Sequence, residues 1–114
     1  MIAASDSHLA VQARFFRGLA DESRLALLQA LRGGERTVSE LVAATGLRQS
    51  NLSGHLACLR SCGLVEARQE WRNVYYRLTG PHVEQLLRDT DLVLEAVAER
   101  MCACTRPEME PTHG

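Results

Sequence analysis

The segment that decides the fold of this chain runs from Thr37 to Gly63 and reads TVSELVAATGLRQSNLSGHLACLRSCG. Its first four residues form a capping-box pattern, in which Thr37 and Glu40 satisfy each other's backbone N–H groups at the start of a helix. We place this short helix at residues 38–45, because the glycine at position 46 is a common helix end. A second helix runs from about residue 48 to 62, and its apolar stripe is Leu52, Leu56 and Leu59. The segment therefore predicts two helices joined by a tight turn.

Helical periodicity also precedes this segment. Asp21, a favoured N-cap residue, predicts a helix in which leucines recur at positions 25, 28 and 31, before glycines 33 and 34 stop it. An earlier helix is indicated by its apolar residues, Leu9, Phe15, Phe16 and Leu19.

After Gly63 the sequence pattern changes from that of helices to that of strands. Residues 64–68 and 74–78 are short, β-branched and aromatic, as strands prefer, and residues 69–73 would form the tip of the hairpin that joins them. A final helix starts at Pro81, a residue favoured in the first helical turn, and runs to Met101.

The order helix, helix, short helix, turn, helix, hairpin, helix is that of a winged helix-turn-helix. We assign residues 8–101 to one mainly α domain with a β-hairpin, which would carry both nucleic-acid binding and dimerisation. Residues 102–114 would form a C-terminal tail.

The last helix has a seam suited to a partner helix. Its apolar positions are spaced 4, 3, 4, 3 and 4 residues apart, as in a coiled coil. The alternative is a helix packed on its own domain, but we favour a homodimer. The seam consists of Val83, Leu87, Thr90, Leu94, Val97 and Met101.

Composition excludes several classes of protein. With 46% hydrophobic and 24% charged residues the chain is an ordinary globular protein, and its apolar helix is too often interrupted by acids to cross a membrane. No signal peptide is apparent, so we expect a cytoplasmic protein without a membrane partner. No catalytic triad, phosphate-binding glycine loop or zinc-protease motif is present, so we do not expect an enzyme.

Charge is distributed unevenly along the chain. The formal net charge is −1, yet residues 48–77 hold five arginines against two glutamates, whereas residues 80–110 hold three arginines against seven acids. Because local charge determines a DNA footprint, the basic middle is compatible with binding double-stranded DNA.

The second helix of the helix-turn-helix would place its first two turns in the major groove. Those turns are rich in hydrogen-bonding side chains, and amide side chains can make two bonds to one adenine. An alternative is an ordinary solvent-exposed face, but the basic hairpin favours DNA. The expected DNA-binding residues are Arg48, Gln49, Ser50, Asn51, Ser53 and His55 on the helix, and Arg68, Trp71 and Arg72 on the hairpin.

Four cysteines in a protein of this compartment suggest metal or redox chemistry rather than structural disulfides. Cys58 and Cys62 lie one helical turn apart, close enough to chelate one soft ion. The alternative is that both are small buried fillers of the core. A closed soft-metal site needs a third ligand, and Cys102 or Cys104 can supply it, with Cys102 ranked first because it directly follows the seam.

Ordered motifs in three regions resemble one family. They are LADESRL at residues 19–25, LRQSNLSGHLACLRSCGLV at residues 47–65 and WRNVYYRL at residues 71–78. These motifs are similar to those of the ArsR/SmtB metal-responsive repressors. The resemblance implies a repressor that binds operator DNA as a dimer through its first and last helices, and that leaves DNA when metal binds. It adds Phe15 to the interface, beside Val83, Leu87, Leu94 and Val97.

This family has several kinds of metal site, which differ in the residues that supply their ligands. The zinc site of the last helix is absent, since Val93 and Ala96 stand at its later ligand positions, and the short helix carries no thiolate pair. The Cys58–Cys62 spacing resembles that of the cadmium- and lead-sensing CmtR group, in which a C-terminal cysteine completes the site across the dimer. The resemblance thus implies Cd(II) or Pb(II) as effector, with As(III) and Zn(II) ranked behind them. An arsenite sensor and a thiol-redox repressor remain alternatives.

Overall fold

The computed structural model describes residues 7–104. For residues 101–104 it describes the backbone alone. It contains five α-helices, a 3₁₀ turn and three strands in these residues. In chain order they are α1 (His8–Leu19), α2 (Glu22–Ala30), η1 (Leu31–Gly33), β1 (Arg36–Thr37), α3 (Val38–Thr45), α4 (Gln49–Ser61), β2 (Val65–Glu70), β3 (Asn73–Leu78) and α5 (Gly80–Cys104). The fold is the predicted winged helix-turn-helix, with α3 and α4 as the helix-turn-helix and β2–β3 as the wing.

The predicted helix signals are confirmed. The carboxylate of Asp21 accepts the backbone N–H of Arg24 at 3.0 Å and caps α2. The capping box of α3 is complete: the N–H of Thr37 donates to the Glu40 carboxylate at 2.9 Å, and the N–H of Glu40 donates to the Thr37 hydroxyl at 3.2 Å. At the other end of α3, Gly46 has φ 75°, a conformation that glycine adopts without steric cost.

The sheet differs from the prediction in two respects. It has three strands in the order β1-β3-β2, because the two-residue strand β1 pairs with the middle of β3. The ladder of β2 and β3 extends to the pair Glu70–Asn73, so the predicted five-residue tip is wrong and only Trp71 and Arg72 form the turn. Neither feature has a local signal: β1 is too short for a period, and the turn lacks the glycine that usually marks it.

The core is built mainly from leucines: those of α2, α3 and α4 form just over half of it, and η1, the wing and α5 contribute the rest. The predicted α4 stripe is confirmed, with Leu52, Leu56 and Leu59 at 0–2% exposure. The stripe of α2 needs a correction, since Leu27 is buried there and Leu25 is 37% exposed. The core fixes the rotation of α4 and therefore decides which of its side chains face outward.

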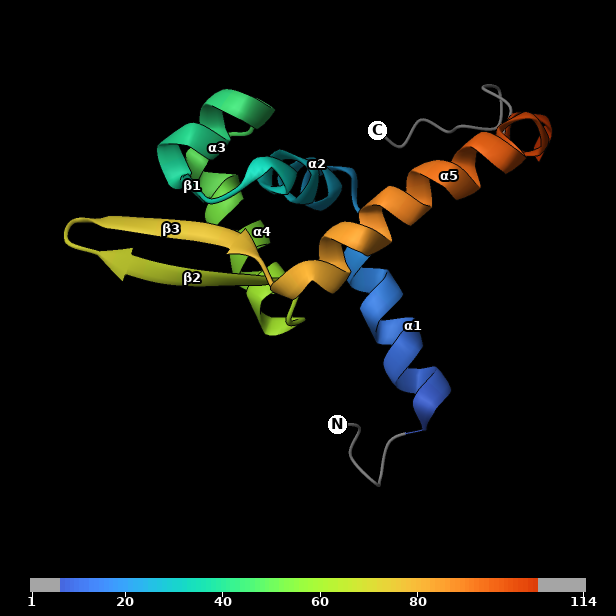
Figure 1. The fold of residues 1–114 in the computed structure, drawn as a ribbon, viewed down its shortest axis with the longest axis horizontal. Helices are drawn as coiled ribbons and strands as arrows, with labels where there is room; N and C mark the ends of the chain where they lie inside the picture. The colour runs from blue at the N-terminus through green and yellow to red at the C-terminus, as the bar shows by residue number, and fades with distance from the viewer. Residues whose placement is uncertain (1–6, 105–114) are drawn as a thin grey trace.

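The wing and the two terminal helices lie on opposite sides of the molecule. Figure 1 shows the β2–β3 hairpin extending to one side, whereas α1 and most of α5 project from the other. The C-terminal half of α5 runs past the body of the domain, with Leu92 and Val93 at 63% and 58% exposure. Within the described residues, no helix is both long enough and apolar enough to span a lipid bilayer.

Candidate nucleic-acid interface and metal site

The N-terminal turns of α4 present an exposed polar face. Because the leucine stripe is turned inward, the predicted base-reading side chains all point to solvent in this single chain: Arg48, Gln49, Ser50, Asn51 and Ser53. Arg48 occupies the N-cap position and makes no side-chain capping bond. Its guanidinium is therefore not used to begin the helix.

His55 is placed differently from the rest of this set. Its Nδ1 lies 3.9 Å from a carboxylate oxygen of Asp21, the residue that caps α2, and its side chain is only 25% exposed. The ring thus lies between α4 and the start of α2, and contact of His55 with DNA stays a prediction.

Arg68 is held by carboxylates of its own chain. Two of its nitrogens donate to the two oxygens of Glu35 at 2.8 Å each, and a third donates to Glu70 at 2.7 Å. The hydrogen bonds from Arg68 are the main reason that the pKa of Glu35 lies below its ordinary value. A guanidinium with two carboxylate partners is less available to a phosphate, and the assignment of Arg68 as a DNA-binding residue stays a prediction.

The tip of the wing carries a strained aromatic residue. Trp71 is 84% exposed and has φ 63°, a backbone region in which a bulky residue is a genuine outlier. The guanidinium of Arg72 lies 5.3 Å from the centroid of its ring, within the range of a cation–π contact. Such strain costs about 1–3 kcal/mol and is concentrated at functional sites.

The thiols of Cys58 and Cys62 lie together at the C-terminal end of α4. Both are half-buried and neither is in a disulfide. Burial raises the pKa of the Cys62 thiol above its ordinary value, and the neighbouring Cys58 thiol raises this pKa further. Thiolates are the donors that soft metal ions prefer, and a role of this pair as metal ligands stays a prediction.

Helix α1 packs directly on this thiol pair. A Cβ atom added to Gly18 would lie 3.0 Å from the Cys62 sulfur, so glycine is the residue that permits this approach. A cavity of about 460 Å³ opens beside Cys62, between α1 and the end of α4. Its walls are formed by Val11, Arg14, Phe15, Ser61 and Cys62.

The remaining predicted ligands cannot be placed. Cys102 and Cys104 belong to the last turn of α5, but their side chains lie outside the described residues. Among the side chains that are described, no three histidine, cysteine or acidic residues are grouped closely enough to hold a metal. A third metal ligand therefore stays a prediction.

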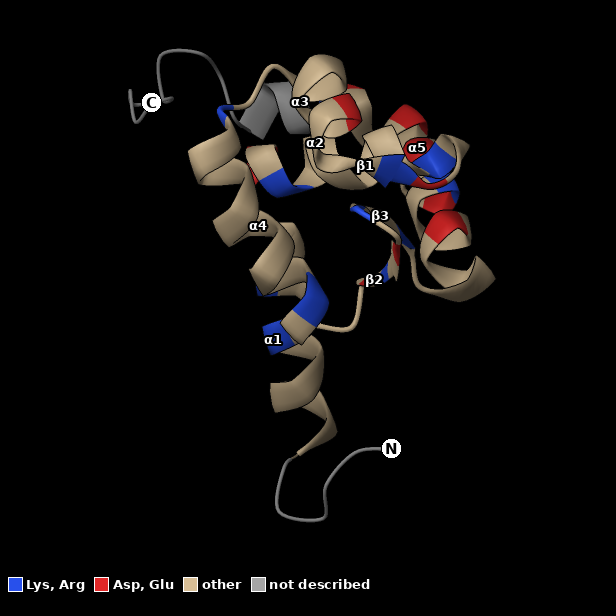
Figure 2. Cartoon of the chain, turned by 90° about the vertical axis from the view of Figure 1, so that its left-hand side faces the viewer, with Lys and Arg blue, Asp and Glu red and all other residues tan. Residues whose placement is uncertain are grey.

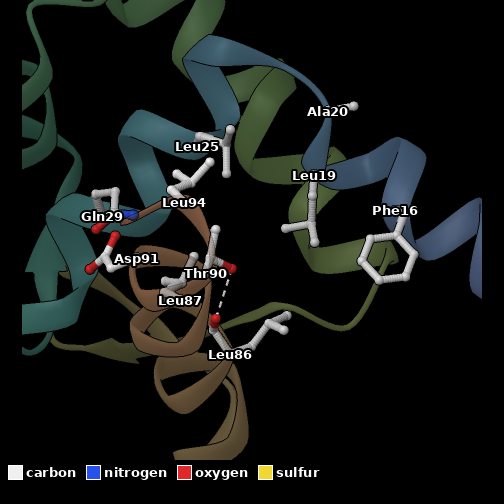
Figure 3. A pocket seen from close by; sticks show the side chains of 10 residues that line it. All are labelled: Phe16, Leu19, Ala20, Leu25, Gln29, Leu86, Leu87, Thr90, Asp91 and Leu94. Carbon is white, nitrogen blue, oxygen red and sulfur yellow. Dashed lines mark hydrogen bonds between the residues drawn. The ribbon is translucent and has the colours of Figure 1, made fainter. Parts of the chain in front are cut away.

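An apolar groove separates α1 and α2 from α5. Figure 3 shows Phe16 and Leu19 of α1 on one wall, Leu25 and Gln29 of α2 on another, and Leu86 to Leu94 of α5 opposite them. The groove has a volume of about 470 Å³. An ion pair of 3.2 Å between Arg32 and Asp91 joins η1 to α5 at the groove's side.

The predicted dimer-interface residues differ in how much surface they expose in the single chain. Leu87 is only 3% exposed and belongs to the core of its own chain, so it has almost no surface left to bury against a partner. Phe15 and Val83 are also partly buried against that core. Of the other predicted interface residues, Leu94 is 43% exposed and Val97 is half-buried. Phe16, which was not in the predicted set, lines the groove and is 55% exposed. Phe16 was identifiable as apolar, but its direction depends on how α1 packs.

Acidic residues are concentrated away from the reading face. Figure 2 shows several of them on α5, on the opposite side of the view from α4. The distribution keeps the acidic helix apart from the polar face of α4 and agrees with the charge asymmetry of the sequence.

Comparisons with known proteins place this arrangement in context. Residues 21–67 match the model of the family described as bacterial regulatory protein, arsR family. The chain is 40% identical over 100 residues to a probable mercury resistance operon repressor of Streptomyces lividans, covering 88% of this chain and 80% of the relative. It is 41% identical over 95 residues to the transcriptional regulator CmtR of Mycobacterium bovis, covering 82% and 80%.

Solved structures give the same family. The homodimeric winged helix-turn-helix domain of Mb0332 from Mycobacterium bovis, a possible ArsR-family regulator, superposes with a TM-score of 0.74 at 36% identity. That match covers 86% of this chain and 95% of the other. All of these relatives are regulators of transcription or DNA-binding domains rather than enzymes.

Proposed function

The chain belongs to the ArsR/SmtB family of metal-responsive transcriptional repressors, and we propose that it holds operator DNA as a homodimer and releases it when Cd(II) or Pb(II) binds to its cysteine thiolates. One observation carries this proposal: α4 has an exposed polar face at its N-terminal end and a half-buried pair of thiols at its C-terminal end. The same rigid helix thus joins the two functions.

The DNA-binding part of the proposal rests on the exposed residues of α4 and the wing tip. Gln49, Ser50, Asn51 and Ser53 would read base edges in the major groove, where amide and hydroxyl groups can distinguish base pairs. Arg48 and Arg72, which form no ion pair with any described carboxylate, would bind phosphates and fix the register.

The wing tip yields a prediction. Replacing Trp71 with glycine is expected to raise the free energy of unfolding by up to about 1 kcal/mol, because glycine adopts positive φ without strain. The same variant is expected to bind operator DNA more weakly, because the exposed ring is lost. Urea denaturation and fluorescence anisotropy measure the two effects. Trp71→Ala is the matched control, since it removes the ring and keeps the strain. A glycine variant that binds DNA as well as the wild type would remove Trp71 from the interface.

The homodimer is supported by the apolar groove between α1, α2 and α5 and by a relative described as homodimeric. A groove lined by Phe16, Leu25 and Leu94 exposes apolar area that a second copy would cover. Two reading heads would then bind two half-sites of one operator.

The metal-binding part of the proposal uses Cys58 and Cys62 as ligands, to which we add Cys102 or Cys104 as the third thiolate. The length of α5 indicates which copy supplies it. The helix begins beside the end of α4, where the N–H of Thr79 donates to the carbonyl of Leu64 at 3.0 Å. Cys102 lies 22 residues beyond Gly80, or about 33 Å along the axis of a helix. A tail thiolate at this site would therefore come from the partner subunit.

Release of DNA would follow from contact between the thiol pair and α1. Gly18 packs on the Cys62 sulfur, and Arg24 donates to the carbonyls of Gly18 at 2.7 Å and Arg17 at 3.3 Å, joining the end of α1 to α2. A metal bound there would tie the end of α4 to α1 and to the partner's α5. A preference of a few kcal/mol for one orientation of the reading heads is enough to empty the operator.

The test is a titration of labelled promoter DNA with reduced protein. Binding is expected to weaken steeply with salt. The slope of log affinity against log salt concentration should decrease in magnitude by about 0.9 for each phosphate contact removed. Arg72→Ala should lower that slope by about this amount, whereas Arg68→Ala should leave it unchanged, because Glu35 and Glu70 already neutralise Arg68. Adding Cd(II) should release the DNA while thiolate-to-metal absorbance appears. Absence of DNA binding, or binding that Cd(II), Pb(II) and Hg(II) all leave unchanged, would contradict the proposal.

A further inference from the structure

We propose that Glu35 is a positioning residue of the DNA interface: its carboxylate holds the Arg68 guanidinium on the wing, away from phosphates, and thereby lowers the affinity of the chain for DNA of any sequence. The inference rests on the proposed function, because it concerns the strength with which the wing binds DNA. Less of the total affinity then comes from sequence-independent contacts, and more comes from the base-reading residues of α4.

The short strand β1 places Glu35 beside the wing. The two residues of β1 pair with Tyr75 and Tyr76 in the middle of β3. The guanidinium Nε of Arg36 in β1 also donates to the carbonyl of Ala30 at 2.8 Å, which joins β1 to the end of α2. Glu35 directly precedes β1, so this ladder determines where its carboxylate lies relative to the wing.

The guanidinium of Arg68 is held by three neighbours. Its Nε and one terminal nitrogen donate to the two oxygens of Glu35 at 2.8 Å each, and the other terminal nitrogen donates to Glu70 at 2.7 Å. The guanidinium carbon lies 4.8 Å from the ring centroid of Tyr75, the residue opposite Arg68 in the β2–β3 ladder, within the range of a cation–π contact. Paired bonds to one carboxylate fix the direction of a guanidinium as well as its position.

Glu35 is the stronger of the two carboxylate partners. It accepts two hydrogen bonds from Arg68 and its side chain is 27% exposed, whereas Glu70 accepts one and is 64% exposed. Water screens the more exposed pair more strongly. The pKa of the Arg68 guanidinium lies above its ordinary value, and hydrogen bonding to Glu35 is the first cause, ahead of hydrogen bonding to Glu70. Loss of Glu35 should therefore free Arg68 more than loss of Glu70.

The charged face of the wing carries more carboxylates than guanidinium groups. Glu66, Arg68 and Glu70 alternate along β2 and share one face, with Arg77 opposite Glu66. The Nε of Arg77 donates to Glu66 at 3.1 Å, and another of its nitrogens lies 4.0 Å from Glu35. Three carboxylates thus pair with two guanidinium groups on this face. The arginine count of residues 48–77 therefore overstates the positive charge that this part of the chain offers to phosphates.

Arg68 lies close to the tip of the wing, where we propose a phosphate contact. It precedes Trp71 by three residues, which is about 10 Å along a strand. Each strand of DNA carries a phosphate about every 3.4 Å of helix axis. If Arg72 binds one phosphate, others lie within that distance, so an Arg68 side chain that Glu35 no longer holds can bind one of them.

The experiment measures binding of the full, reduced, metal-free chain to a labelled duplex of random sequence over a range of salt concentrations. Glu35→Ala should raise the affinity for this duplex at least about threefold at about 50 mM salt. It should also raise the magnitude of the slope of log affinity against log salt concentration by about 0.9, the value of one additional phosphate contact. The matched control is Glu95→Ala, which removes a carboxylate from an exposed position of α5 outside the apolar groove. An equal gain in the control would overturn the inference, because the gain would then come from net charge.

A double-mutant cycle separates this role from a merely structural one. Adding Arg68→Ala to Glu35→Ala should remove the whole gain in affinity and return the slope to that of the wild type, since the freed group is then absent. Loss of a purely structural ion pair would weaken binding instead, and Arg68→Ala would not reverse it. If Glu35→Ala fails to fold, Glu35→Gln removes the charge at the same size and passes through the same cycle with the same expected directions. An unchanged slope, or a gain that survives the loss of Arg68, overturns the inference.

Failure of this inference is distinguishable from failure of the proposed function. A wild-type chain that binds promoter DNA and releases it with Cd(II), and whose Glu35→Ala variant gains no affinity for random duplex, overturns the inference and leaves the repressor proposal standing. The expected cycle in a chain whose DNA binding no metal changes supports the inference and contradicts the metal-responsive part of the proposed function. A wild-type chain that binds no duplex DNA overturns both.

Discussion

Replacing Cys62 with serine is expected to abolish the release of DNA by metal while leaving the affinity of the metal-free protein for DNA close to that of the wild type. Cys62 is one of two thiols in contact at the end of α4, and a serine hydroxyl does not replace a thiolate for a soft ion. Loss of an outer-shell partner alone costs about 10–100-fold in metal affinity, so loss of a ligand should cost at least about 100-fold.

Basal DNA binding should survive for a structural reason. Cys62 caps α4 through its backbone N–H, which donates to the carbonyl of Cys58 at 3.0 Å, and serine keeps this bond. Thiolate-to-metal absorbance measures binding, and anisotropy of labelled operator DNA measures release. Ala57→Ser is the control, because it adds a hydroxyl to an exposed position of the same helix. Normal release of DNA by Cd(II) from the Cys62→Ser variant would show that this pair is not the sensor.

Replacing Phe16 and Leu94 together with glutamate is expected to convert the dimer into monomers and to abolish tight operator binding. Both residues line the apolar groove, and both are exposed in the single chain, so the change leaves the chain's own core intact. In a dimer their carboxylates would lose water without gaining partners, which is strongly unfavourable. Loss of the second reading head removes a gain in avidity of about 10²–10⁴.

Sedimentation measures the mass of this variant, and anisotropy measures its affinity for an operator with one or two half-sites. Leu92→Glu is the matched control, since Leu92 lies on α5, is 63% exposed and does not line the groove. Leu87→Glu would not test the interface, because Leu87 belongs to the core and its substitution would unfold the chain. A Phe16 and Leu94 variant that sediments as a dimer would place the interface elsewhere.

Local signals in the sequence were sufficient for the helices. Helix α3 lies at residues 38–45 as predicted, because its capping box and its closing glycine act within a few residues of the chain. The leucine stripe of α4 was equally readable, since one face of a helix is defined by period alone.

Features that depend on distant parts of the chain were not readable. The carboxylate partner of Arg68 was not predicted, because nothing in the hairpin indicates that Glu35, 33 residues earlier, holds its guanidinium. The burial of Leu87 and the exposure of Phe16 likewise depend on how α1, α2 and α5 pack. A seam of apolar residues identifies the face of a helix that is buried, and it does not state whether the helix buries that face in its own chain or in another.

The contact between Gly18 and the Cys62 sulfur has a consequence for how such repressors can diverge. The side chains that would select DNA lie in the first turns of α4, whereas Cys58 and Cys62 lie at its other end. After a gene duplication, one copy can therefore acquire a new operator through changes in the first turns and keep its effector. Gly18 is under a stricter constraint, because a Cβ atom there would lie 3.0 Å from the Cys62 sulfur. Natural variation at this position should be the narrowest on α1.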